Sequence, residues 1–354
     1  MNFNFSNISI AVIGDMNLDI DFIGEYSGLM SREKESLAIH SSESDKVFYS
    51  GGGAGNIVEV LSSMGVGAIY PVGAWNPTLC DRSLSLYRRY MKLPGIASME
   101  YMAEGYSTPA FIKFYMPSGH HIFRANVGAD VMSEETEKQL VGNLSRLPEV
   151  DLVIVADYDE DGRGVLSGKV HTAIYNSFVL PSRHSDQVMV GLSRKRIGSL
   201  CNYDYLLLNT KELDGFTSKE KNVDRAWQIA DLMGRTKTKN VLLTLEDEGC
   251  AIYTRDTESK AIAACRIGSE FISKVMIGSK PVYAKIDTCG AGDALLAVFA
   301  ACIAKGMKPE DAIKAGNAAA RAEVKLLYGA RPISLEMVKA EYEEVYGGAG
   351  YESI

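Results

Sequence analysis

The feature that most constrains the fold of this chain is an alternation of short apolar runs with longer amphipathic stretches. Residues 8–14, ISIAVIG, form a continuous apolar run, which is typical of a strand buried on both faces of a sheet. Similar runs follow at residues 68–72, 152–156, 205–208 and 241–245. Helical periods lie between or after them, at residues 54–64, 133–147, 223–234, 291–305, 309–327 and 334–346. This order predicts a layered α/β fold with a mostly parallel sheet.

Two regions interrupt the alternation with β-rich segments. Residues 19–50 alternate without a helical period, and residues 110–115 and 120–124 flank a Pro-Ser-Gly turn, as in a hairpin. Short strands beside a parallel sheet commonly form a lid over an active site. An exposed extension that only dimerises is the alternative, and one element can do both. The expected organisation is one domain, residues 1–346 with lid strands at about 19–50 and 109–125, and a tail, residues 347–354.

Composition excludes several classes of protein. The 37 basic and 45 acidic residues give a net charge of −8, which argues against general affinity for nucleic acid or for an anionic membrane. Six cysteines lie far apart without a C-x-x-C pair, as expected of free thiols in a reducing cytoplasm. No signal-type apolar run opens the chain, and the run at residues 294–304 is too short to span a bilayer. We therefore expect a cytoplasmic protein.

The strongest chemical motif is DTCGAGD at residues 287–293, followed at once by an apolar helix. Its small residues Gly290, Ala291 and Gly292 place successive backbone N–H groups at a helix start, which can hold a phosphate or a developing anion. A carboxylate beside such a site, that of Asp293, can accept the proton of an attacking hydroxyl. The alternative is that Gly-Ala-Gly allows close packing and Asp293 merely complements the helix dipole.

A second glycine-rich run, GGGAGN at residues 51–56, precedes another helix. It fails the dinucleotide fingerprint because Asn56 stands where the third glycine belongs. It also follows the lid-like segments and not the first strand of the parallel sheet. Glycines with a terminal amide can hold sugar hydroxyls, although taken alone the pattern favours a structural turn. The chain also has no G-x-x-x-x-G-K-[ST] run, which excludes a Walker-type phosphate loop.

Polar residues follow two of the expected strands. Asp15 and Asp19 come at the end of the first strand, where ligand sites of parallel sheets are expected, and could hold substrate hydroxyls or a cation. A solvated loop is the alternative. Asn209 and Glu212 follow the run at residues 205–208 and suit an Mg²⁺ site in which water separates ion and protein. Taken alone, this pair favours an ordinary helix cap.

Read in this order, the motifs resemble the ribokinase-like (PfkB) family of sugar kinases over residues 8–334. The resemblance rests on GGGAGN, on Asn209-x-x-Glu212 and on the DTCGAGD segment. It implies a three-layer α/β fold, in which helices flank a central, mostly parallel sheet and a small β-sheet lid covers the sugar. The implied activity is ATP-dependent phosphorylation of a sugar or sugar-phosphate hydroxyl with Mg²⁺.

The resemblance also implies roles for individual residues. Asp293 is the implied catalytic base, beside an anion hole of Gly290, Ala291 and Gly292. The implied contacts of the acceptor sugar are Asp15, Asp19, Gly52, Gly53 and Asn56. Those of ATP are Asn209, Glu212, Thr244, Gly249 and Asn317, of which Asn209 and Glu212 would organise Mg²⁺ through water. Asp287 and Thr288 would border a monovalent-cation site, as in some relatives.

Several segments are similar to the heptose-7-phosphate kinase branch, among them VIGDMNLD, HHIFRAN and VIVADYD. Two segments depart from it: residues 153–164 match loosely, and residues 189–196 replace an acidic-proline turn. The candidate acceptors are therefore D-glycero-D-manno-heptose 7-phosphate, fructose, ribose and a nucleoside. A phosphorylated acceptor needs a cationic partner, for which the candidates are Arg124 on the hairpin, Arg82, Arg88, and the cluster Arg194, Lys195 and Arg196. Each of these taken singly is more typical of a solvated surface charge.

Two other functions compete with the kinase. A non-catalytic sensor on the same fold would bind sugar or nucleotide without forming product. A nicotinamide-dependent oxidoreductase would bind its dinucleotide at the loop of residues 51–56. Asn56 argues against this function, because it stands where the fingerprint needs a glycine. The expected partners are a small sugar or sugar phosphate, ATP and a second copy bound through the lid, with neither nucleic acid nor membrane.

Overall fold

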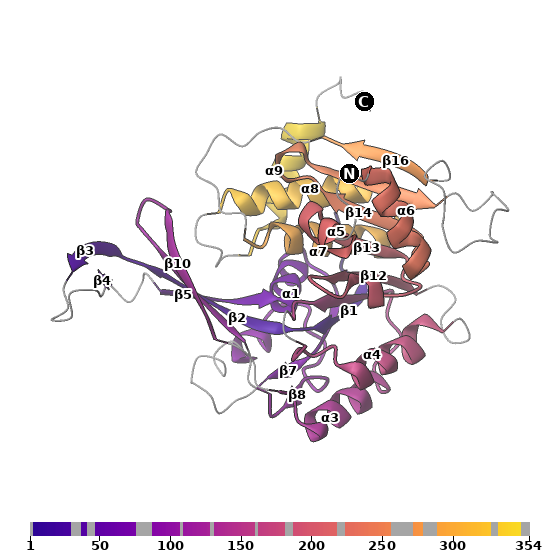
Figure 1. The fold of residues 1–354 in the computed structure, drawn as a ribbon, viewed down its shortest axis with the longest axis horizontal. Coiled ribbons are helices and arrows are strands. Elements are labelled where there is room, and N and C mark those ends of the chain that lie inside the picture. The colour runs from indigo at the N-terminus through magenta and orange to yellow at the C-terminus, as the bar shows by residue number, and fades with distance from the viewer. Residues whose placement is uncertain are drawn as a thin grey trace.

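The computed structural model describes twelve segments of the chain, residues 3–29, 37–40, 47–75, 87–106, 109–127, 131–159, 162–180, 187–217, 224–255, 272–278, 289–326 and 332–347. Its centre is an eight-stranded sheet in the order β16-β15-β14-β13-β12-β11-β1-β6 (Figure 1). The six strands from β14 to β6 are parallel, and β15 and β16 are antiparallel additions. The strands are β1 (Ser9–Gly14), β6 (Ala68–Val72), β11 (Leu152–Asp157), β12 (Val188–Ser193), β13 (Tyr205–Asn209), β14 (Asn240–Thr244), β15 (Cys250–Arg255) and β16 (Ile272–Ile277).

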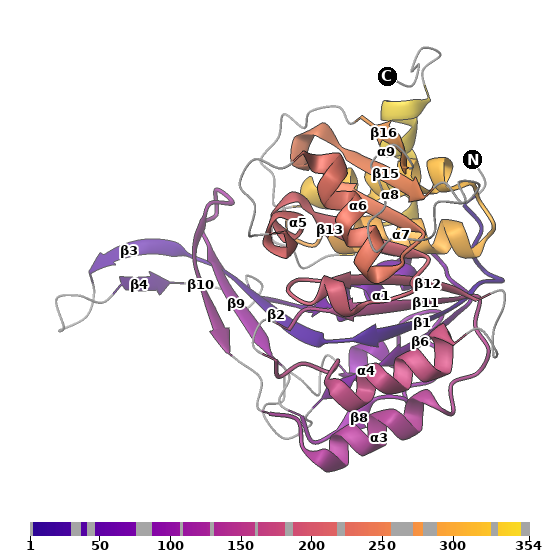
Figure 2. The same ribbon diagram turned by 45° about the vertical axis from the view of Figure 1, so that its right-hand side comes forward.

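The helices cover both faces of this sheet because side chains alternate along each buried strand. In β1, Ile10 and Val12 pack with one set of helices, whereas Ala11 and Ile13 pack with another. The first set is α1 (Ala54–Ser63), α7 (Ala291–Ala304), α8 (Pro309–Val324) and α9 (Leu335–Tyr346). The second is α3 (Glu134–Leu144), α4 (Gly168–Ile174), α5 (Thr210–Phe216) and α6 (Arg225–Thr236). Figure 2 shows α3 and α4 on the opposite side of the sheet from α7 and α8, so the predicted layered α/β fold is confirmed.

Each of the six helices predicted from the sequence is present, with ends within a few residues of the expected ones. Ser133 caps the start of α3, because its side chain accepts a hydrogen bond from the backbone N–H of Thr136 at 3.1 Å. Sequence reasoning missed β12, β15, β16 and α4. In β12 the apolar run is interrupted by Gly191, which the packing requires: a Cβ there would lie 2.8 Å from the ring of Tyr203.

A second, four-stranded sheet stands beside the central one, in the order β10-β9-β2-β5. Its strands are β2 (Met16–Ile23), β5 (Val47–Gly53), β9 (Ala110–Tyr115) and β10 (His121–Val127). We call these four strands the lid sheet. It extends to one side of the body in Figure 1, where the small pair β3 (Glu25–Leu29) and β4 (Leu37–His40) continues it, and a second pair, β7 (Ala74–Trp75) and β8 (Ala103–Glu104), lies apart.

The glycine-rich run forms the junction between a strand and a helix. Gly51, Gly52 and Gly53 are the last residues of β5, paired with β2, and α1 begins at the next residue, Ala54. Gly53 has φ 59°, a left-handed conformation that glycine adopts without strain. The run therefore joins the lid sheet directly to the body.

No helix in the described segments is long and apolar enough to cross a membrane.

Candidate active site

Several polar residues gather where parallel strands of the central sheet end. Asp15, which follows β1, and Asn209, which ends β13, were predicted as site residues, whereas Asp157, at the end of β11, and Ser193, at the end of β12, were not. The carboxyl ends of parallel strands share one edge of the sheet, which is where open α/β sheets bind ligands. The lid sheet starts from the same edge, because β2 begins one residue after Asp15.

Asp293 lies in the first turn of α7 and is held by two donors from other elements. The Asn56 side-chain amide on α1 donates to its Oδ2 at 3.1 Å, and the Tyr158 hydroxyl, after β11, donates to its Oδ1. Burial raises the pKa of Asp293 to about 6, against the lowering effect of these two hydrogen bonds and of Arg194. Asn56 and Asp293 were predicted to share a site, and the structure brings them into contact. Tyr158 was not predicted.

Gly290 caps the start of α7 in a left-handed conformation, with φ 81°. A Cβ at this position would lie 2.8 Å from the Asn56 amide nitrogen and 2.9 Å from Glu323 Oε1. The first N–H groups of a helix have no intrahelical acceptor, so the start of α7 offers donors next to Asp293. Gly292 is exposed and Ala291 half-buried at this end. The expected anion-binding arrangement is therefore geometrically available.

Asp15 is buried under the strand ends and is already bonded to backbone. Its Oδ1 accepts from the N–H of Val165 at 2.7 Å, and its Oδ2 accepts from the N–H of Tyr158 at 2.9 Å. Burial raises the pKa of Asp15 to about 6, and the charges of Asp157 and Asp159 add to the rise. Asp15 therefore holds the segment around Tyr158 in place. Its contact with the sugar stays a prediction.

The strand β2 places a row of polar side chains in the lid sheet. Asp19 Oδ2 lies 3.0 Å from the ammonium of Lys113, which comes from β9, and Asp21 Oδ1 lies 3.9 Å from it. Burial lowers the pKa of Lys113, but the two carboxylates raise it more, so that it lies above its ordinary value. Lys113 is thus a buried, charged partner of two acids, which sequence reasoning missed.

Two acceptors in this row have no donor within the segments that the structure describes. They are Asn17 Oδ1 and Asp19 Oδ1, both buried. Gly52 lies directly beside them, since a Cβ on Gly52 would come within 2.6 Å of Asp19 Oδ1. Buried acceptors are costly unless a donor reaches them, and sugar hydroxyls are such donors. Asn17 could have been found from the sequence, because it precedes Asp19 by two and so shares its face of a strand.

Asn209 and Glu212 form a reciprocal cap at the start of α5. The Asn209 side chain accepts from the N–H of Glu212 at 2.8 Å, and the Glu212 carboxylate accepts from the N–H of Asn209 at 2.8 Å. This is the helix cap that the pair alone suggested. Burial raises the pKa of Glu212, whereas the cap and the charge of Arg194 lower it. Arg194 acts on the pKa of Asp293 in the same direction, so it lies near both carboxyls.

The described residues contain no group of three or more His, Cys, Asp or Glu placed to hold a metal ion. Glu212 at the start of α5 offers a half-buried carboxylate. A single carboxylate is compatible with the water-mediated Mg²⁺ expected from the sequence, since Mg²⁺ usually keeps several waters and binds few carboxylates.

The remaining predicted nucleotide contacts lie along the strand ends and α8. Thr244 ends β14, and Gly249, with φ 98°, starts the return into β15. Asn317 is buried on α8, where its amide donates to the Tyr346 hydroxyl at 2.5 Å and to the Gly278 carbonyl at 3.4 Å. The Asn317 side chain is therefore bonded within the protein.

The cationic residues predicted to meet a phosphate on the acceptor have different surroundings in the structure. Arg196 pairs with Asp157 at 2.6 Å and Asp159 at 3.3 Å, so it fastens the end of β12 to that of β11. Arg124 is exposed on β10, where it lies 4.0 Å over the Phe111 ring and donates to Asn126. Arg88 is exposed. Arg82, Asp287 and Thr288 lie outside the described residues.

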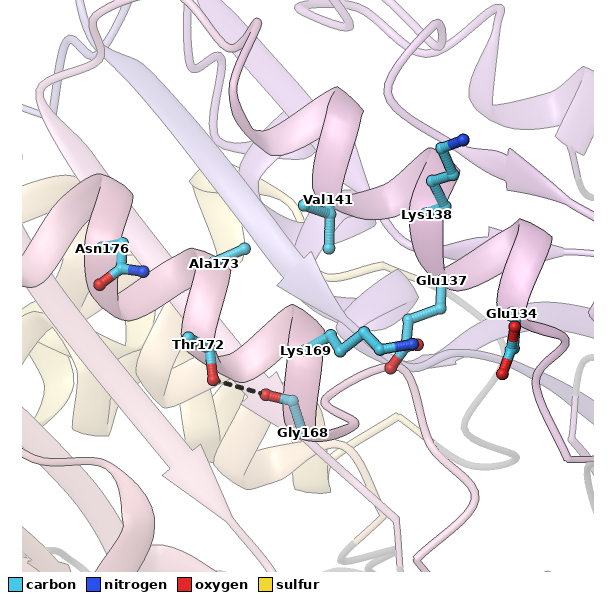
Figure 3. Close-up of a pocket in the computed structure, with 9 residues that line it drawn as sticks. All are labelled: Glu134, Glu137, Lys138, Val141, Gly168, Lys169, Thr172, Ala173 and Asn176. Atoms are coloured by element: carbon cyan, nitrogen blue, oxygen red, sulfur yellow. Dashed lines mark hydrogen bonds and ion pairs between the residues drawn. The ribbon is translucent and has the colours of Figure 1, made fainter.

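An open groove elsewhere on the molecule contains none of these residues. It lies between α3 and α4 and is lined by Glu137, Lys169 and Asn176, among others (Figure 3). The Lys169 ammonium lies 2.8 Å from Glu137 Oε2 across it. The candidate active site is therefore at the strand ends and not in this groove.

Known proteins similar to this chain include carbohydrate kinases. Residues 193–333 match the model of the pfkB family carbohydrate kinase. The chain is 25% identical over 364 residues to "Bifunctional protein HldE" of Bradyrhizobium sp. (strain ORS 278), covering 98% of this chain and 67% of that protein. It is 24% identical to the protein of the same name from Granulibacter bethesdensis, covering 96% and 66%. The chain thus spans about two thirds of the length of these relatives.

Solved structures share the fold. Phosphofructokinase-2 from Escherichia coli in complex with fructose-6-phosphate superimposes with a TM-score of 0.70 at 17% identity, over 96% of this chain and 99% of that one. Ribokinase from Thermotoga maritima gives a TM-score of 0.67 at 19% identity, over 95% and 99%. The predicted ribokinase-like fold and the predicted resemblance to PfkB kinases are both confirmed.

Proposed function

We propose that this chain is a carbohydrate kinase of the PfkB type and that it transfers the γ-phosphoryl group of ATP to D-glycero-D-manno-heptose 7-phosphate. The observation that carries the transfer is the contact of Asp293, in the first turn of α7, with Asn56 and Tyr158. The choice of acceptor is supported by the heptose-kinase-like segments of the sequence and by similarity to the two proteins named HldE. The alternatives are another sugar, of the fructose, ribose or nucleoside type, and a non-catalytic sensor.

In the proposed reaction the γ-phosphate lies at the start of α7. The N–H groups of Gly290, Ala291 and Gly292 would stabilise the oxygens of the phosphoryl group as it transfers. The acceptor hydroxyl would attack the phosphorus while Asp293 takes its proton, and the bond from phosphorus to the leaving ADP oxygen would break. The pKa of Asp293 is raised only to about 6, so this carboxylate is ionised at neutral pH, as a base must be.

The acceptor would lie against the lid sheet, with hydroxyls donating to the buried oxygens of Asn17 and Asp19. Lys113 is neutralised by Asp19 and Asp21, so this part of the site suits a neutral polyol and not a phosphate. The phosphate of the acceptor would then point away from β2, and Arg124 on β10 remains its proposed partner.

Glu212 and Asn209 would hold Mg²⁺ through water, with ATP supplying the other ligands. The ion would neutralise charge on the ATP phosphates. Arg194 would add a positive charge on the same side, since it acts on the pKa of both Glu212 and Asp293. A monovalent cation near Asp287 and Thr288 stays a proposal from the resemblance alone.

An ADP-release assay over a panel of acceptors tests this function. The panel contains D-glycero-D-manno-heptose 7-phosphate, fructose phosphates, ribose and nucleosides. We expect the highest kcat/KM with the heptose phosphate. A higher value with another sugar would overturn the acceptor and leave the kinase. Binding of sugar or nucleotide without ADP release from any acceptor would favour the sensor.

We also propose that two copies associate through the lid sheet. The outer strand β10 exposes Phe123, 40% accessible, and Val127, 52% accessible, which is unusual for apolar side chains on a strand. Phe123 stacks on Phe114, and Phe114 on Phe22, so the exposed ring continues an aromatic row across the lid sheet. A second lid sheet of the same chemistry would cover this row.

Phe123→Asp is expected to convert the dimer to a monomer, because a charge would be buried in an apolar contact. Sedimentation velocity at several protein concentrations measures the change. Leu180→Asp is the matched control, since Leu180 is 39% accessible but lies beyond α4, away from the lid sheet. Dissociation by Leu180→Asp with no effect of Phe123→Asp would place the interface elsewhere.

A further inference from the structure

We propose that Tyr158 is a positioning residue for Asp293, whose carboxylate it holds in a fixed orientation together with Asn56. The inference rests on the proposed function, because it takes Asp293 as the base that meets the acceptor hydroxyl. Tyr158 follows directly on the last residue of β11. Its hydroxyl donates to Oδ1 of Asp293, which lies in the first turn of α7.

The ring of Tyr158 is itself fixed by three neighbours. Its backbone N–H donates to Asp15 Oδ2 at 2.9 Å, which ties the start of the residue to the end of β1. Gly53 leaves room for the ring, since a Cβ there would lie 2.9 Å from it. The guanidinium of Arg194 lies 5.2 Å from the ring centroid. A ring so enclosed can deliver its hydroxyl to one place.

Asp293 is consequently held at both oxygens. Tyr158, directly after β11, donates to Oδ1, and Asn56, on α1, donates to Oδ2. Two donors from different elements fix the plane of the carboxylate. Each carboxylate oxygen has a second lone pair, so the acceptor hydroxyl can still donate to Asp293. Reacting groups held in the correct geometry react faster than free ones, and small misplacements are costly.

The groups around Asp293 decide in which direction its pKa would shift when the Tyr158 hydroxyl is removed. Arg194, Tyr158 and Asn56 lower the pKa of Asp293, whereas burial, the largest effect, and Asp19 raise it. The charge of Asp293 also raises the pKa of Glu212. Burial and the charge of Asp293 raise the pKa of Tyr158 well above its ordinary value, so the hydroxyl stays a donor. Loss of this donor would raise the pKa of Asp293 above about 6.

Asp15 also has a pKa raised to about 6, so it must be told apart from Asp293 in a pH profile. The two respond differently to a change at Tyr158. Asp15 is bonded to the backbone N–H of this residue, which any side chain retains, whereas Asp293 is bonded to the hydroxyl. A shift of the acid limb on removal of the hydroxyl therefore reports on Asp293.

Tyr158→Phe tests the proposal in the full-length enzyme. We expect kcat to fall by about 10- to 100-fold, the acceptor KM to change by less than about twofold, and the acid limb of kcat to move to higher pH. Asn56→Ala removes the other donor without touching the Tyr158 ring and should give the same changes in kcat and in the acid limb. Its acceptor KM is left out of the comparison, because Asn56 is also an expected contact of the sugar. Tyr175→Phe, on the helical segment after α4, should give none of these changes. Thermal unfolding of each variant checks that it is folded.

The outcomes separate this proposal from the proposed function. If Tyr158→Phe changes only the acceptor KM, or changes neither kcat nor the acid limb, Tyr158 does not position Asp293. If Asp293→Asn still turns over at the normal rate, the base assignment of the proposed function fails, whatever Tyr158 does. If Tyr158→Phe fails to fold, unchanged kcat and acid limb in Asn56→Ala would overturn the idea of a carboxylate held from two sides.

Discussion

Asp293→Asn is expected to lower kcat by about 10²- to 10⁴-fold while leaving the affinity for ATP nearly unchanged. The amide keeps the size of the side chain and can still contact Asn56 and Tyr158, but it cannot accept a proton from the acceptor. The carboxylate of the natural residue can, because its pKa is about 6 and it is ionised at neutral pH. The kcat comes from the ADP-release assay, and ATP affinity from titration calorimetry without acceptor.

The matched control for this variant is Asp311→Asn. Asp311 occupies the first turn of α8 as Asp293 occupies that of α7, but it lies beside Lys314 and away from the strand ends. Its removal should leave kcat within about twofold. Normal turnover by Asp293→Asn, or an equal loss in both variants, would show that the first-turn carboxylate of α7 has no special part in the reaction.

Lys113→Met is expected to destabilise the protein by about 3 kcal/mol at neutral pH. Lys113 is 3% accessible, and its ammonium faces Asp19 and Asp21. Methionine fills a similar volume but removes the ammonium that faces two carboxylates in a buried place, which costs more than the loss of an exposed pair. Urea unfolding gives the free energy of unfolding of both proteins.

The pH dependence of this loss distinguishes charge from packing. The deficit of Lys113→Met should shrink as the pH falls toward about 4, because protonation neutralises carboxylates that have lost the facing ammonium. Lys239→Met provides the control, since the ammonium of Lys239 pairs with Asp204 at 2.6 Å but its side chain is 69% accessible. That variant should lose less than about 1 kcal/mol. A deficit for Lys113→Met that is the same at every pH would point to packing alone.

The layered fold could be predicted because its signals are local. The apolar run of β1 and the periods of α7 and α8 are each contained in one stretch of sequence. The strand β12 escaped notice because Gly191 divides a run of only 6 residues, and the reason for that glycine is the ring of Tyr203, which lies on another segment. A short buried strand of this kind is recognisable only once its neighbours are placed.

The candidate site was predictable where a motif carries its own chemistry. Asp293 and Asn56 are 237 positions apart and meet as expected from two glycine-rich helix starts. Lys113 could not be recognised, because a lysine in AFIKFY looks like the solvent-facing position of an alternating strand. Its partners come from β2, and only the strand order of the lid sheet reveals them. Tyr158 likewise depends on a contact between β11 and α7.

The junction at Asp15 sets limits on how the lid sheet can move. One residue separates β1 from β2, and none separates β5 from α1, so the lid sheet has two stiff connections to the body and no slack linker at either. The N–H of Ala54 also donates to the Asp15 carbonyl at 3.0 Å, which ties the two connections to each other. A movement of the lid sheet toward a bound sugar would therefore bend the chain at this junction. The same movement would displace the first turn of α1 and with it Asn56. Binding of the sugar and orientation of the Asp293 carboxylate would then be coupled.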